Sequence, residues 1–140
     1  MGKINMGRVI LGGLLAGLVM NIGETLLNTV IVGEEFEAAT EALGLPPVGG
    51  SAIAIFVIMG FALGCAMVWL YAAIRPRFGA GPKTAICAGL LIWSFVYLYA
   101  GIGWMAMGLF PSSLIMVSIL WGLFEVPISA VAGAWLYKEE

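Results

Sequence analysis

Four apolar stretches, each long enough to cross a lipid bilayer, make up most of this chain. A transmembrane helix needs about 20 apolar residues, and a helix satisfies its own backbone hydrogen bonds where no water is present. The 140 residues are 62% hydrophobic and only 10% charged, unlike soluble domains. The sequence therefore predicts a single membrane domain, an all-α integral membrane protein with four transmembrane helices in a bundle. The predicted spans are residues 8–32, 53–74, 83–107 and 112–137.

The largest segment between the predicted spans is the first outer loop, residues 33–51. It is too short to bury a core of its own. Within it, residues 34–43 have the pattern of a short amphipathic helix, with Phe36, Ala39 and Leu43 on one side and glutamates on the other. We expect this helix to lie on the bilayer surface or to cap the bundle.

The basic residues all fall on one side of the predicted membrane. They are Lys3, Arg8, Arg75, Arg77, Lys83 and Lys138. Because cytoplasmic loops carry an excess of Lys and Arg, we expect both termini and the 75–83 loop in the cytoplasm. The expected location is a bacterial cytoplasmic membrane. The first span lacks an Ala-x-Ala cleavage site, so we expect it to be retained rather than removed as a signal peptide.

A weak internal similarity suggests a tandem repeat of two helical hairpins. The sequence Trp-Leu-Tyr ends the second span at 69–71 and the fourth at 135–137, and Gly-Leu-Leu occurs at 13–15 and 89–91. A duplicated hairpin would produce both matches. Aromatic residues placed at the membrane interface explain the first match equally well, so both interpretations stay open.

Small residues spaced four apart occur in every predicted span. Such spacing lets helix backbones approach closely in lipid, so it predicts a tightly packed bundle. In the first span the small face continues through Asn21 and other polar residues, which places them on the packing side of the helix. The pairs are Gly13/Gly17, Gly60/Gly64, Ala85/Gly89 and Ser129/Gly133.

Two glutamates inside apolar spans, Glu24 and Glu125, are the strongest indication of function. Ionisable residues are costly in hydrocarbon and usually face a protein interior or a polar cavity. At about 1.5 Å per residue, Glu24 lies roughly 24 Å from Arg8 and Glu125 roughly 19 Å from Lys138. The two depths agree within one helical turn, so the acids are predicted to share one site if their helices are neighbours.

The predicted site combines these acids with neutral oxygens and aromatic rings. Two close carboxylates without a basic partner cannot both stay charged, which favours proton or cation binding. Aromatic rings suit an organic cation, although they are also common in packing. Besides the acids, the candidate residues are Asn21, Asn28, Ser118, Ser129, Tyr97 and Trp93. The alternative is that protonated glutamates only hydrogen-bond across helices and hold the bundle together.

Two classes of function remain open from the sequence. The first is a homo-oligomeric carrier or channel with an intramembrane carboxylate site. The second is a non-catalytic accessory or assembly subunit that docks to a larger membrane complex.

We expect no enzyme activity, because no nucleophile and base pair or phosphate loop accompanies the acids. The chain has no histidine and two cysteines, Cys65 and Cys87, so we expect no cofactor. The absence of a basic patch argues against nucleic acid.

Overall fold

The computed structural model describes residues 2–139, and this part of the chain is helical with no strands. Two of the four long helices contain a π-helical turn, labelled η. In chain order the elements are α1 (Met6–Leu26), η1 (Leu27–Ile31), α2 (Gly33–Ala42), α3 (Gly50–Phe78), α4 (Pro82–Trp93), η2 (Ser94–Tyr99), α5 (Ala100–Met107) and α6 (Ser112–Leu136).

Four helical segments are long and apolar enough to span a membrane, which confirms the predicted number of spans. The boundaries differ most for α3, which begins at Gly50 and ends at Phe78 rather than covering 53–74. Hydropathy marks the apolar part of a span, whereas the helix continues into polar flanks that the bilayer core need not cover. The four segments are Met6–Ile31, Gly50–Phe78, Pro82–Met107 and Ser112–Leu136.

The helix ends follow local sequence chemistry. Asn5 caps α1, because its side-chain oxygen accepts the Arg8 N–H at 3.0 Å. Pro82 occupies the first position of α4, where a missing N–H costs nothing. Gly108 ends α5 with φ at 66°, in the left-handed region that glycine adopts without strain.

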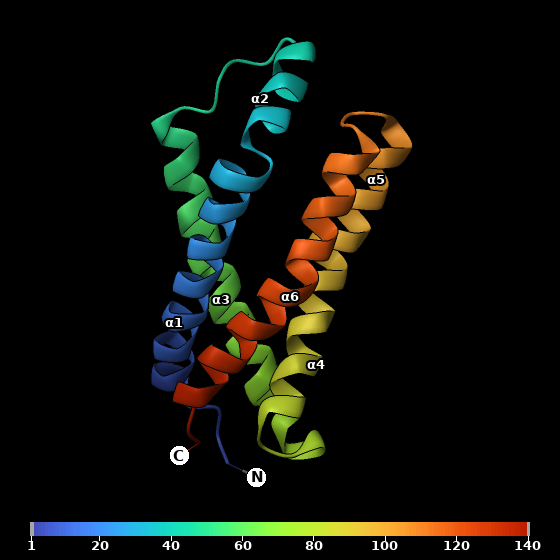
Figure 1. Ribbon diagram of the computed structural model, residues 1–140. Helices are drawn as coiled ribbons and strands as arrows, with labels where there is room; N and C mark the ends of the chain where they lie inside the picture. Colours follow the sequence, from blue (N-terminus) through green and yellow to red (C-terminus); the bar gives the residue numbers. More distant parts are fainter. Residues whose placement is uncertain (1, 140) are drawn as a thin grey trace.

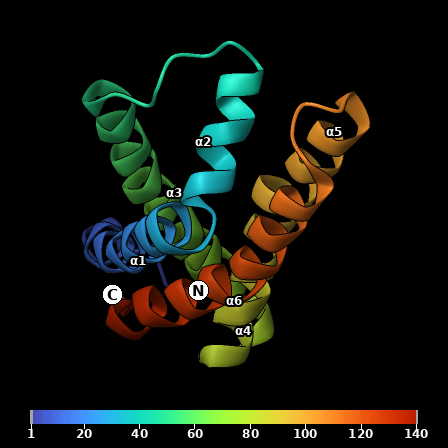
Figure 2. The same cartoon turned by 45° about the horizontal axis from the view of Figure 1, so that its top comes forward.

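The helices pack as two antiparallel pairs, α1 with α3 and α4 with α6, and α1 also packs against α6. Both termini lie at the same end of the bundle (Figure 1). At the opposite end α3 and α5 diverge, and α2 lies between them (Figures 1 and 2). We call these the terminal end and the α2 end. The molecule is therefore tightly joined at one end and splayed at the other.

Glycines in α1 and α3 bring these two backbones together. An added Cβ on Gly13 would lie 2.5 Å from the Cys65 Cα, and one on Gly17 would lie 2.7 Å from the Phe61 Cα. An added Cβ on Gly64 would lie 2.6 Å from the Gly17 nitrogen. Backbone atoms cannot move away as a flexible side chain can, so this contact requires glycine. The predicted small-residue faces thus do form a helix interface.

A glycine also allows the backbones of α4 and α6 to approach closely. An added Cβ on Gly89 would lie 2.9 Å from the Cα of Pro127 and 3.0 Å from the Cβ of Ala130. Val126 and Ser129, on the same part of α6 as Pro127, are fully buried, and so is Met67 of α3. The main apolar core therefore lies where α1, α3, α4 and α6 all meet, toward the terminal end.

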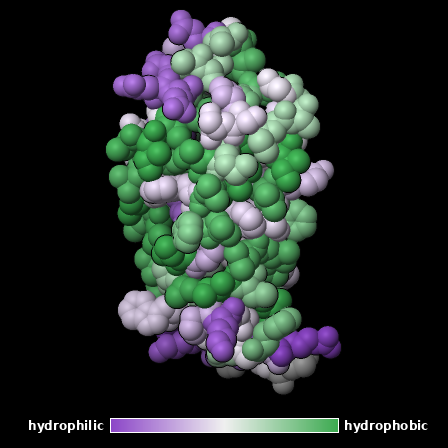
Figure 3. All heavy atoms as spheres, turned by 45° about the vertical axis from the view of Figure 1, so that its right-hand side comes forward, coloured by the Kyte–Doolittle hydropathy of each residue, from purple (hydrophilic) through white to green (hydrophobic). Residues whose placement is uncertain are grey.

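The surface has the polarity expected of a membrane-embedded protein. Figure 3 shows a broad hydrophobic band between hydrophilic groups at the two ends. The basic residues flank the helix ends at the terminal end, and four glutamates lie on or beside α2 at the other. Exposed apolar side chains on all four spans suit contact with lipid.

The short helix α2 covers the α2 end of the bundle. Phe36 stacks on Phe110, with ring centroids 5.8 Å apart, and Ala39 joins a cluster with Leu114. The predicted helix at 34–43 is thus present at Gly33–Ala42. The prediction for Leu43 was wrong, because this residue follows the last helical turn and is exposed.

Candidate functional site

The hydroxyl of Tyr97 lies between the carboxyl groups of Glu24 and Glu125. It makes a short hydrogen bond to Oε1 of Glu24 and a second contact of 3.0 Å to Oε2 of Glu125. The three side chains come from three different spans. A single polar cluster therefore links α1, η2 and α6 within their apolar spans.

Each member of the cluster is positioned by a different element. Glu24 lies in the last turn of α1, just before η1, and Tyr97 lies within η2. Glu125 lies near the middle of α6 and is only 7% exposed. Both π-helical turns therefore lie at the site. Such turns occur often at functional sites, because one extra residue in the turn changes the direction of the side chains that follow.

Glycines give the cluster its close packing. The ring of Tyr97 lies against Gly122, where an added Cβ would be 2.6 Å from Cδ1 of the ring. On the other side, an added Cβ on Gly23 would overlap Oε1 of Glu125. The site thus depends on two positions without side chains, one on α6 and one on α1.

Two further donors complete the hydrogen bonds of the acids. Nδ2 of Asn28 donates to Oε2 of Glu24 at 3.0 Å and to the Glu24 carbonyl at 2.8 Å. The indole Nε1 of Trp121 donates to Oε1 of Glu125 at 3.4 Å. Each carboxyl group therefore has one neutral donor of its own and shares Tyr97 with the other.

The two contacts of the Tyr97 hydroxyl require more protons than the hydroxyl itself has. A tyrosine hydroxyl has one proton, whereas an ionised carboxylate can only accept hydrogen bonds. If both acids were ionised, Tyr97 could satisfy only one of them. Both contacts become hydrogen bonds when one acid carries a proton and donates it to the tyrosine oxygen. The geometry therefore has room for one proton more than the tyrosine supplies.

No basic side chain neutralises the acids within the described residues. The ion pair found there joins Arg75, in the last turn of α3, and Glu139 at 4.0 Å. Within residues 2–139, no group of three His, Cys, Asp or Glu side chains is placed to hold a metal ion. The oxygens gathered here come from two carboxyls and one phenol, which suit a proton or a hard cation better than a soft metal.

Four of the eight predicted site residues come together and four do not. Glu24, Glu125, Tyr97 and Asn28 share the cluster. Asn21 instead faces α3 and donates to the Val57 carbonyl at 3.2 Å. The other three make hydrogen bonds to backbone carbonyls: Ser118 to Leu114, Ser129 to Glu125 and Trp93 to Ile119.

These four side chains lie outside the cluster because each finds a hydrogen-bond partner elsewhere. A serine inside a helix readily bonds the carbonyl four residues earlier, and both serines do so. Trp93 has one donor, and the Ile119 carbonyl accepts it at 2.9 Å. Asn21 continues the glycine face of α1, and its side chain packs against Gly60. Helical spacing gives a shared face, but a face can point at different neighbours.

Sequence reasoning missed Trp121, Gly23 and Gly122. Trp121 precedes Glu125 by four residues, a spacing that puts two side chains on the same helix face. This signal was available in the sequence. Gly122 precedes Glu125 by three residues and shares its face in the same way. Gly23 had no comparable signal, because its role depends on which helix faces it.

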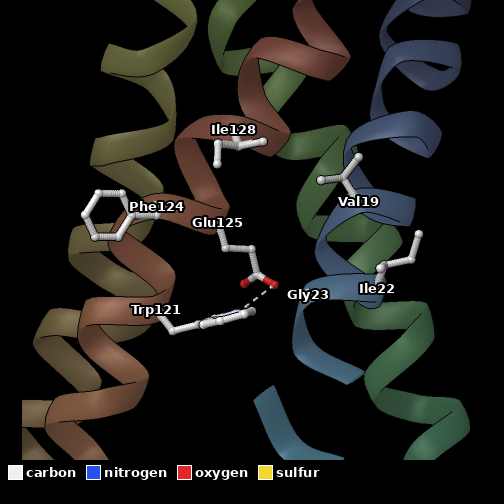
Figure 4. A pocket seen from close by; sticks show the side chains of 7 residues that line it. All are labelled: Val19, Ile22, Gly23, Trp121, Phe124, Glu125 and Ile128. Carbon is white, nitrogen blue, oxygen red and sulfur yellow. Dashed lines mark hydrogen bonds between the residues drawn. The ribbon is translucent and has the colours of Figure 1, made fainter. Parts of the chain in front are cut away.

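A groove opens beside Glu125 on the outside of the bundle, between α1 and α6, with a volume of about 380 Å³. Its walls are apolar, with Val19 and Ile22 on one side and Phe124 and Ile128 on the other. Figure 4 shows the Glu125 carboxyl group pointing between these walls toward Gly23. One carboxyl oxygen thus faces the groove while the other faces Tyr97.

A scan against protein-family models, a search of curated proteins and a search of solved structures each found no match to this chain.

Proposed function

We propose that this protein is a membrane carrier or channel that binds a proton or a small cation at Glu24, Tyr97 and Glu125. The observation that carries the proposal is the position of the Tyr97 hydroxyl between two carboxyl groups from different spans. An intramembrane acid of this kind usually serves an ion pathway or a proton relay. A proton is the simplest occupant, because it completes the hydrogen bonds of the cluster.

Proton binding would also change the shape of the bundle. With a proton present, the cluster holds α1, η2 and α6 together through two hydrogen bonds. With the proton absent, two carboxylates face each other across one donor and repel. Because α3 and α5 already diverge at the α2 end, loss of the cluster would let the two helix pairs separate further. Loss of the proton is thus coupled to opening at the α2 end, and protonation to closing.

Use of the glycine faces within the chain favours this proposal over an accessory subunit. Gly13, Gly17, Gly64 and Gly89 all contact other helices of the same chain, so they are not left over for a partner. Four spans enclose little space, and for this reason we propose that the carrier acts as a homo-oligomer.

The test is proton flux in liposomes under an imposed membrane potential, followed with a pH-sensitive dye inside the vesicles. Glu24→Gln and Glu125→Gln are each expected to abolish the flux that wild type supports. Glu37→Gln is the matched control, since Glu37 is exposed on α2, and it is expected to retain wild-type flux. If wild type carries neither protons nor small cations while all variants assemble normally, the carrier proposal fails. The accessory-subunit alternative would then be favoured.

We propose further that both termini lie in the cytoplasm of a bacterium, because the basic residues gather at the terminal end. In a background without the native cysteines, Lys138→Cys is expected to resist a membrane-impermeant maleimide added to intact cells. Ser51→Cys, near the α2 end, is expected to react. The reverse pattern would invert the proposed orientation.

A further inference from the structure

The groove between α1 and α6 joins a buried acid directly to the lipid-facing surface. Glu125 lies at its floor with one oxygen toward Gly23, and the exposed side chains of Ile22, Phe124 and Ile128 border the opening. Its volume of about 380 Å³ falls within the usual range for small-molecule sites. A carboxyl group therefore meets the bilayer through an apolar opening.

The depth of Glu125 decides where an occupant comes from. At about 1.5 Å per residue, Glu125 lies roughly 20 Å from Ser112 and roughly 17 Å from Leu136 along α6. These distances put it near the middle of a hydrocarbon core about 30 Å thick. Lipid headgroups and their amines remain at the interfaces, so they do not reach it. The occupant must itself be soluble in the hydrocarbon.

The chemistry of the groove selects the charge of the occupant. Its one ionisable group is an acid, and no basic side chain lines it. The indole of Trp121 lies next to the acid, where an aromatic face can attract a cation. An anion would meet a carboxyl group with no donor to spare. A neutral apolar molecule would contact the walls of the groove but would not interact with the Glu125 carboxyl group.

We propose that the groove binds a lipophilic organic monocation, a molecule with a single positive charge inside an apolar body, which enters sideways from the bilayer. This proposal rests on the proposed function insofar as both use Glu125 as the ion-binding acid. It adds a substrate class and a route of entry. The apolar body contacts Val19, Ile22, Phe124 and Ile128, and the charge lies against the Glu125 carboxylate.

Binding of the cation is accompanied by release of one proton from Glu125. When Glu125 is protonated, its O–H bond breaks as the cation arrives, the proton leaves to water, and the carboxylate then faces the bound charge. Trp121 donates to the resulting carboxylate, and Tyr97 donates its single proton to it when Glu24 carries a proton of its own. The cation and the proton therefore compete for one acid, as exchange of one for the other requires.

The experiment measures equilibrium binding of tetraphenylphosphonium to wild-type protein in lipid nanodiscs, with empty nanodiscs subtracted. Tetraphenylborate, which has similar shape and opposite charge, is the ligand control. We expect saturable binding of the cation with release of protons into a weakly buffered solution. Glu125→Gln is expected to weaken binding roughly tenfold or more, since it leaves the cation without its charged partner.

A pair of bulky substitutions separates the groove from general hydrophobic partition. Ile128→Trp fills the opening and is expected to abolish binding. Ile102→Trp makes the same change on α5, at a residue of similar exposure, 52% against 60%, and is expected to bind as wild type does. Glu24→Gln leaves the groove unaltered, so cation binding is expected to persist even where proton flux is lost.

Several results would overturn the inference. One is equal affinity of wild type and Glu125→Gln, and another is equal binding of tetraphenylborate. A third is full binding by Ile128→Trp. Intact proton flux in a protein that binds no tetraphenylphosphonium would reject the groove proposal and leave the proposed function standing. Saturable, Glu125-dependent binding of tetraphenylphosphonium without any proton flux would support the groove proposal and reject the proposed function.

Discussion

Gly23 of α1 faces Glu125 of α6 so closely that a Cβ on the glycine would overlap the glutamate carboxyl group. The acid can occupy its present position only because residue 23 has no side chain. The adjacent residue, Glu24, contributes the second acid of the cluster from the same helical turn. One turn of α1 thus provides both an acid and the space for its partner.

Gly23→Ala is therefore expected to displace the Glu125 carboxyl group and to reduce proton flux. Because the overlapping atoms are the end of a side chain, which can turn aside more easily than backbone can, the cost in stability should be below the about 1–3 kcal/mol typical of overpacking. The measurements are flux in liposomes and the thermal midpoint of unfolding in detergent. Gly103→Ala is the matched control, because an added Cβ there meets open space. Equal behaviour of the two variants would contradict the contact between Gly23 and Glu125.

Tyr97→Phe is expected to lower proton flux strongly while changing stability little. The substitution keeps the ring that packs against Gly122 and removes only the hydroxyl shared by the two acids. The net contribution of a hydrogen bond to stability is about 1 kcal/mol, so the bundle should still assemble. Tyr99→Phe, at a residue that is 75% exposed, should leave both quantities unchanged. Full flux in Tyr97→Phe would remove the hydroxyl from the proposed pathway.

Gly64→Ala is expected to separate α1 from α3. The added methyl group would lie 2.6 Å from the Gly17 nitrogen and 3.0 Å from its Cα. Since both atoms belong to backbone, the helices must move apart, at a cost of about 1–3 kcal/mol. Thermal unfolding of Gly64→Ala beside Gly103→Ala measures the effect. An unchanged midpoint would show that the two helices do not approach this closely.

Phe36→Ala is expected to loosen α2 without unfolding the four spans. The stacked pair of Phe36 and Phe110 is the main aromatic contact of α2, and such a pair contributes about 0.5–1.5 kcal/mol beyond its buried area. Hydrogen exchange should quicken in Gly33–Ala42 and remain slow in α6. Leu43→Ala, at an exposed residue, serves as the control and should leave exchange in α2 unchanged. Equal exchange rates in Phe36→Ala and wild type would mean that other contacts hold α2.

The spans could be predicted because hydrocarbon imposes a strict rule on composition and length. The agreement in depth between Glu24 and Glu125 also followed from counting residues along two helices. Whether those helices are neighbours did not follow, since small residues occur in every span and indicate close packing without naming the partner. The faces of α1 illustrate the limit. Asn21 and Glu24 lie on adjoining turns, yet one faces α3 and the other faces η2.

The role of Tyr97 could be predicted only in part. Its place opposite the acids agreed with helical spacing, but the sequence suggested an aromatic face for a cation. In the folded chain it is the hydroxyl that contacts both acids. Its partner in that prediction, Trp93, uses its indole N–H on a backbone carbonyl instead. The residue types determined which contacts Tyr97 and Trp93 could make. Which of these contacts form depends on how α6 packs against α4 and η2.

The π-helical turn at Ser94–Tyr99 has a consequence for how such a site is gained or lost. Each residue of a helix advances the chain by about 100° around the axis. Deleting one residue ahead of Tyr97 would turn its ring by roughly that angle, away from both acids, while every residue of the site remained in the sequence. A change of a single codon in length, with no substitution at all, is therefore enough to disconnect Glu24 from Glu125.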